Sequence, residues 1–191
     1  MSATDLAGRG SDGERTPWVR LHEHNAKADR YPLAILVWGS GANDSIEYRK
    51  RCEIREALTN AGHSAVFSED LIDKSRAVDD ALDEELLQVD AADLVVVLYG
   101  SRGTQSEIDV LLDDPRFAEK AIIFIHVDTK PGAFHGVSGA RWEKLARRAQ
   151  VIEYTTEQLN RCDVVGQATQ LATKIRRAAY VRDLKQRRRE L

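Results

Sequence analysis

The sequence predicts an α/β protein in which a parallel sheet of about five strands lies between two layers of helices. Short apolar runs recur along the chain, and both faces of the run at residues 33–38 are hydrophobic, as in the central strands of parallel sheets. Helical patterns separate these runs, and this alternation requires crossover connections that place helices on both faces of the sheet. The 191 residues, 42% of them hydrophobic, suffice for one domain with a substantial core.

The first predicted strand is LAILVW at residues 33–38, which ends at a Gly-Ser-Gly turn. A helix is predicted over residues 45–61, because apolar side chains recur there at helical spacing and Gly62 is a typical helix stop. The run SAVFS at residues 64–68 is the second predicted strand.

The clearest strand is LVVVLY at residues 94–99, because β-branched residues dominate it. The pattern before it predicts a helix over residues 77–91 with an acidic outer face. The segment after the strand begins with glycines and then becomes helical up to Pro115.

The fourth predicted strand is AIIFIHV at residues 121–127, and VIEY at residues 151–154 is the last. A short helix is predicted over about 140–148, between these two strands. The run TTEQ at residues 155–158 fits a capping box, and a final helix begins near Gly166. Five strands alternating with helices predict a flavodoxin-like or Rossmann-like three-layer sandwich.

The chain divides into three predicted parts. Residues 1–29 are polar and without sustained periodicity, so we expect a flexible segment, whereas residues 30–165 form the α/β domain. Residues 166–191 form a basic helix that packs on the domain or extends from it. The apolar side of this helix is expected to face the domain and its basic side outward, where another copy of the chain or an acidic partner protein could bind; RNA is the less favoured alternative, because Tyr180 is the one aromatic residue among the basic ones.

Composition narrows the classes of ligand. With 28 basic and 31 acidic side chains, the net charge of −3 gives no general attraction to nucleic acids or anionic membranes. No apolar run approaches the roughly 20 residues needed to span a bilayer, and no secretory signal is recognisable, so we expect a cytoplasmic protein. No cluster has metal-ligand spacing, so we expect neither a metal nor a resident cofactor.

Two glycine-containing loops follow predicted strands, and ligands of open parallel sheets bind beyond such strand ends. Glycines allow close backbone approach, and nearby hydroxyl and amide groups can hold ribose or phosphate oxygens. The first loop lacks both the GxGxxG pattern and the phosphate-loop lysine. The candidate nucleotide-binding residues are Gly39, Ser40, Gly41, Asp44, Tyr99, Ser101, Arg102, Gly103 and Thr104.

Glu107 is the candidate catalytic residue. It stands three residues after Thr104, a spacing that also fits a capping box, in which the glutamate only caps the helix. A position in the first helical turn favours the ionised carboxylate through the helix dipole. Such a carboxylate can stabilise or attack the cationic anomeric carbon that forms when a sugar loses its leaving group.

The segment made of Asp93, the strand 94–98, Ser101, Gly103, Thr104 and Glu107 resembles the motif of TIR-like and nucleoside 2-deoxyribosyltransferase-like bacterial nucleotide-processing domains. The resemblance covers roughly residues 33–127. It implies that Glu107 acts at an N-glycosidic bond, that residues 39–44 contact a nucleotide, and that NAD is the substrate. It also implies an effector role in bacterial defence. The sequence departs from the motif at Ile108-Asp109, where a small residue and a glycine are frequent.

Two other functions fit the same residues. A non-catalytic module would bind a nucleotide signal or assemble with other copies, with Glu107 only capping its helix. A phosphoryl-transfer switch is disfavoured, because the first strand is followed by Gly-Ser-Gly instead of the paired carboxylates of a magnesium site.

Overall fold

The structure is a computed structural model that describes residues 17–41, 44–71, 81–100, 104–129 and 139–189. The described residues contain one five-stranded, all-parallel sheet with the strand order β2-β1-β3-β4-β5, which confirms the predicted fold class. This is the order of flavodoxin-like sheets. The strands are β1 (Ala34–Gly39), β2 (Ser64–Val66), β3 (Leu94–Tyr99), β4 (Ala121–His126) and β5 (Gln150–Tyr154).

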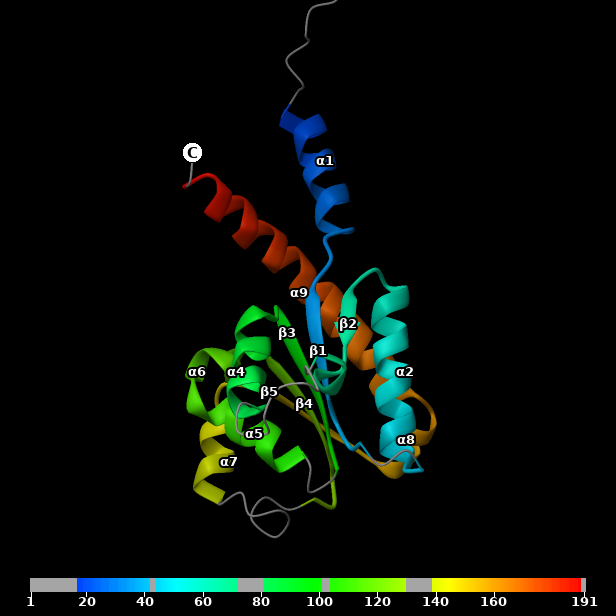
Figure 1. Ribbon diagram of the computed structural model, residues 1–191. Helices are drawn as coiled ribbons and strands as arrows, with labels where there is room; N and C mark the ends of the chain where they lie inside the picture. The colour runs from blue at the N-terminus through cyan, green and yellow to red at the C-terminus, as the bar shows by residue number, and fades with distance from the viewer. Residues whose placement is uncertain (1–16, 42–43, 72–80, 101–103, 130–138, 190–191) are drawn as a thin grey trace, which may run out of the picture.

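Helices cover both faces of the sheet, as Figure 1 shows. One layer consists of α4 (Ala81–Ala91), α5 (Thr104–Asp113), α6 (Pro115–Glu119) and α7 (Gly139–Ala146). The other consists of α2 (Ile46–Asn60), α8 (Thr156–Asn160) and α9 (Asp163–Arg187). The short helix α3 (Ser68–Leu71) follows β2, and α1 (Pro17–Ala28) precedes the sheet.

The central strand β3 shows why both faces of its sequence are apolar. Val95 and Val97 pack in the core cluster under α4 to α7, whereas Val96 and Leu98 pack in the cluster under α2 and α9. Every residue of β3 is buried. Successive side chains of a strand point to opposite faces, so a strand covered on both sides needs an unbroken hydrophobic run.

The helix α1 was not predicted, because residues 17–28 lack a strong apolar repeat. Pro17 occupies the first helical position, where a missing amide hydrogen is harmless. Tertiary contacts to α9 hold the helix: Nδ1 of His24 lies 2.8 Å from the hydroxyl of Tyr180, and Arg177 donates to Asn25 over 2.8 Å. Residues 1–16 of the predicted flexible segment, and residues 77–80 of the predicted α4, lie outside the described residues.

The helix α9 begins at Asp163, three residues earlier than Gly166, and belongs to the packed domain. Its Arg176 is buried and donates to the backbone carbonyls of Asp29 and Ala61 and contacts the ring of His63. Burial, together with the charge of Arg176, lowers the pKa of His63 to about 4. Figure 1 shows the C-terminal part of α9 extending past the sheet. Within the described residues, no helix has the length and apolar character to cross a membrane.

Gly39 ends β1 with a backbone conformation that the neighbouring strand imposes. Its φ is +145°, and a Cβ atom built there would lie 2.7 Å from the carbonyl oxygen of Leu98. At Gly41, two residues later, an added Cβ would meet nothing within 4 Å. The close approach of β1 to β3 therefore requires glycine at position 39 but not at position 41.

We expect Gly39→Ala to lower the free energy of unfolding by about 2 kcal/mol or more, because alanine strains this φ and collides with a backbone carbonyl. Gly41→Ala is the matched control, with an expected change below about 1 kcal/mol. Urea unfolding followed by circular dichroism measures both. Equal effects of the two substitutions would contradict the strand geometry described here.

Candidate functional site

A cleft of about 570 Å³ lies at the carboxyl ends of β1 and β2, at the edge of the sheet where ligands of such folds bind. The end of β1 and the start of α5 both contribute to it, so it lies at the switch point between β1 and β3, where the strand order reverses. We call it the Glu107 cleft. Its lining residues are Gly39, Gly41, Tyr48, Arg51, Arg55, Phe67, Ser68, Glu69, Asp70, Glu85 and Glu107.

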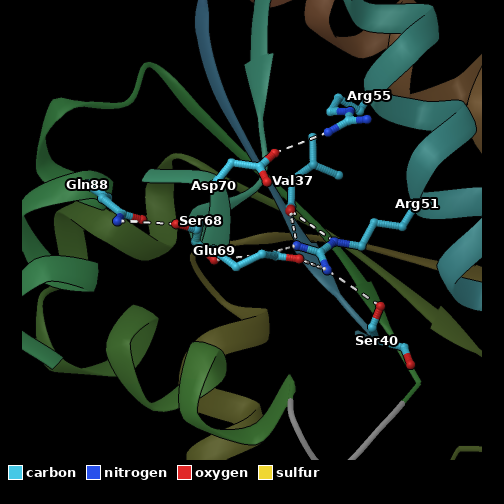
Figure 2. Close-up of polar contacts among 8 residues, drawn as sticks. All are labelled: Val37, Ser40, Arg51, Arg55, Ser68, Glu69, Asp70 and Gln88. Carbon is cyan, nitrogen blue, oxygen red and sulfur yellow. Dashed lines mark hydrogen bonds and ion pairs between the residues drawn. The ribbon is translucent and has the colours of Figure 1, made fainter. Parts of the chain in front are cut away.

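Arg51 of α2 organises one wall of the cleft. Its side chain is buried, and Nε and Nη2 donate to the carbonyl of Val37 over 3.1 and 2.9 Å. Nη1 reaches the carbonyl of Ser40 over 3.5 Å, and both terminal nitrogens bind the carboxylate of Glu69 over 2.8 and 2.6 Å (Figure 2). One guanidinium group therefore joins α2 to the end of β1 and to α3.

Arg55 and Phe67 complete this wall. Arg55 pairs with Asp70 over 3.1 Å, and Gln88 of α4 donates to the carbonyl of Ser68 (Figure 2). The guanidinium groups of Arg51 and Arg55 lie 4.2 and 4.0 Å from the centre of the Phe67 ring. Cation–π contacts of this kind are stronger where water is excluded, so they hold the α3 segment against α2.

Glu107 enters the cleft from the first turn of α5. Glu107 is only 8% exposed, and its Oε2 atom has no hydrogen-bond partner among the described residues. Burial raises the pKa of the Glu107 carboxyl to about 8, although the charge of Arg51 and a hydrogen bond from the backbone of Gly39 act in the opposite direction. The prediction that the helix dipole keeps this carboxyl ionised is therefore wrong for the free protein near neutral pH, because desolvation outweighs the dipole.

Two other acids of the cleft, Glu69 and Glu85, have pKa values shifted in opposite directions. Burial also acts to raise the pKa of Glu69, but the hydrogen bonds and charge of Arg51 outweigh it, so this pKa lies below its usual value. Burial raises the pKa of Glu85, which lines the cleft from α4. The cleft thus contains Glu107, whose pKa burial raises to about 8, beside Glu69, whose pKa Arg51 lowers.

The structure brings together only part of the predicted site. Gly39, Gly41 and Glu107 line the Glu107 cleft as expected from the two loops. Ser40 is buried, and its carbonyl accepts a hydrogen bond from Arg51. Thr104 is buried at the start of α5 and is not among the residues that line the cleft.

Two predicted contact residues lie elsewhere. Asp44 is exposed before α2 and is not among the lining residues. Tyr99 is buried in the core, with its ring centre 6.2 Å from that of Trp142, because it shares the face of β3 that α4 to α7 cover. The predicted contacts at Ser101, Arg102 and Gly103 lie outside the described residues.

Sequence reasoning missed Arg51, Phe67 and Glu85. One signal for Arg51 was present: it precedes Ile54 and Leu58 by three and seven residues, so a charged side chain lies on the apolar face of α2. Such a residue needs a buried partner. The described residues contain no group of three or more His, Cys, Asp or Glu side chains that could hold a metal ion.

The sequence matches no protein-family model, and a search of curated proteins also finds no match.

Arg51 and Arg55 form a natural pair for substitution, because each binds one acid and stacks on Phe67, but only Arg51 also binds two carbonyls. We expect Arg51→Ala to lower the free energy of unfolding by about 3 kcal/mol, since it leaves a cavity and unsatisfied carbonyls. Arg55→Ala, a half-exposed control, should cost about 1 kcal/mol or less. Chemical unfolding tests the difference, and similar losses would contradict the anchoring role of Arg51.

Glu107→Gln should stabilise the protein increasingly as the pH rises. The folded pKa of about 8 lies above the ordinary value of 4.5, so between these values the folded state holds a proton that the unfolded state has lost. Stability from this group is therefore lost as the pH rises toward 8. Glutamine does not titrate, so the free energy of unfolding of the variant should increase relative to that of the native protein by a few kcal/mol over this range. The increase per pH unit is at most about 1.4 kcal/mol.

The measurement is the melting temperature of both proteins from pH 5 to pH 8. Glu56→Gln, the same substitution at an exposed position of α2, is the control and should show no such trend. A constant difference between Glu107→Gln and the native protein across this range would show that the carboxyl ionises normally.

Proposed function

We propose that this protein cleaves or transfers the N-glycosidic bond of a nucleotide, with NAD as the substrate and Glu107 as the catalytic residue. The observation that supports this most is a buried carboxyl, with one oxygen lacking a hydrogen-bond partner among the described residues, in an open cleft at the switch point. The resemblance of the segment around Glu107 to nucleotide-processing domains adds support. An effector role in bacterial defence rests on that resemblance alone.

The cleft offers what such a reaction needs. When the bond between C1′ of the ribose and the ring nitrogen of nicotinamide breaks, its electron pair moves to the nitrogen and neutralises the ring. The positive charge then moves to the sugar as an oxocarbenium ion, next to the carboxylate of Glu107. The oxygen of water adds to C1′ and loses a proton, which gives free nicotinamide and ADP-ribose. In a transfer reaction, an acceptor nucleophile replaces the water.

The high pKa of Glu107 fits a cationic substrate. In the free protein at neutral pH the carboxyl is mainly protonated, and this limits the free energy of burying a charge. The positively charged nicotinamide ring favours the ionised form, so binding releases a proton and produces the carboxylate where the sugar cation will form. The backbone hydrogen bond from Gly39 then holds this carboxylate in place.

Purified protein incubated with NAD should release nicotinamide, which chromatography detects. Glu107→Gln should lower the turnover number at least 100-fold, since it removes the charge that stabilises the sugar cation. NAD should still raise the melting temperature of this variant by mass action. Glu56→Gln, exposed on α2, should retain full activity.

Two results would contradict this proposal. Undiminished turnover by Glu107→Gln would remove the glutamate from the mechanism. Stabilisation by NAD without turnover in the native protein would instead favour the non-catalytic nucleotide-sensing module.

The KM for NAD should fall as the pH rises from 6 to 8 and then level off. Deprotonated Glu107 attracts the cationic ring, and the fraction of deprotonated carboxyl in the free protein rises steeply with pH below its pKa of about 8, reaches one half there and approaches one above it. Steady-state kinetics across this range tests the linkage. A KM independent of pH would show that the substrate cation does not contact this carboxyl.

A further inference from the structure

The charges that the described residues contribute to the Glu107 cleft do not balance. Glu69, Asp70, Glu85 and Glu107 supply four carboxyl groups, whereas Arg51 and Arg55 supply two guanidinium groups. With all groups ionised, the formal balance is two positive charges against four negative ones, or −2. Tyr48 is the other titratable side chain on this lining.

Arg51 is not arranged to receive an anion. Arg51 has five N–H groups, and its hydrogen bonds use all of them. Nε and Nη2 donate to the carbonyl of Val37, and Nη1 donates to the carbonyl of Ser40. The second N–H group of Nη1 and of Nη2 donates to the carboxylate of Glu69. Arg55 is paired with Asp70 and stacked on Phe67. The guanidinium group of Arg51 therefore has no N–H group left for a phosphate or carboxylate, and Arg55 already has an acid as its partner.

Glu85 adds a carboxyl group to the lining of the cleft. It comes from α4, and its charge acts on Glu107 strongly enough to contribute to the raised pKa of that carboxyl. No contact to a basic side chain is shown for Glu85 among the described residues, and burial raises its own pKa. Two partly desolvated carboxyl groups that repel each other form a site that a cation stabilises.

We propose that Glu85 is a specificity-determining residue that makes the Glu107 cleft select N-ribosides whose leaving base is cationic and carries no carboxylate. This proposal rests on the function proposed above. Nicotinamide in NAD is such a base, with a neutral amide on a positive ring. Nicotinic acid adenine dinucleotide differs from NAD only in bearing a carboxylate at that position, which the acids of the cleft repel.

The test compares kcat/KM for NAD and for nicotinic acid adenine dinucleotide. The native protein should prefer NAD at least tenfold. Glu85→Gln, which keeps the size of the side chain and removes its charge, should reduce this preference at least threefold. Asp83→Asn is the matched control, since it removes an exposed charge from the same helix and should leave the preference unchanged.

The outcomes separate the two proposals. Turnover of both dinucleotides with equal kcat/KM overturns the selectivity while the glycosidic activity stands, and a preference unaffected by Glu85→Gln overturns the role of Glu85. If neither dinucleotide is cleaved, the proposed activity fails, but selectivity is still tested by the rise in melting temperature that each one causes. A larger rise with NAD supports the selectivity, and equal rises or none overturn it.

Discussion

The guanidinium group of Arg51 is the contact on which the rest of the site depends. It comes from α2 and binds the carbonyls of Val37 and Ser40 at the end of β1, together with the carboxylate of Glu69 after β2. Three segments that are distant in sequence therefore meet at one buried cation. A buried charge is tolerated only when it is paired and fully hydrogen-bonded, and all the donors of Arg51 are used. The same cation lies near Glu107 and opposes the effect of burial on its ionisation.

Glu107 shows how stability and function conflict in this fold. A core position beside β1 and β3 would be filled most stably by an apolar side chain, and Ile108, its neighbour in sequence, is fully buried. Glu107 is instead a carboxyl whose oxygen Oε2 lacks a hydrogen-bond partner among the described residues, and such a group destabilises the folded state. Strongly shifted ionisation in a cleft is characteristic of functional carboxyl groups. Burial also raises the pKa of Glu85 in the same cleft.

The sequence predicts the sheet well, because a strand that is buried on both faces requires a continuous hydrophobic run, which is visible in the sequence. The run at residues 94–99 could only be a central strand, and the capping box at Thr155 and Gln158 is present as predicted. The site is less predictable, because its key contacts link residues such as Arg51 and Glu69, whose proximity depends on how α2 and α3 pack against β1. Tyr99 points into the core because successive side chains of β3 alternate between the two faces of the sheet. The pKa of Glu107 is raised by desolvation, which no local sequence pattern reveals. The helix α1 depends on tertiary contacts with α9 and has only a weak pattern of its own.

The most direct test of this account is an NMR titration of the side-chain carboxyl carbon of Glu107, assigned by comparison with Glu107→Gln. The account predicts a midpoint near pH 8 in the free protein, which moves to lower pH when NAD is bound. A midpoint near the ordinary value of 4.5, unchanged by NAD, would contradict it, because the carboxyl would then be neither desolvated nor in contact with a cationic ligand.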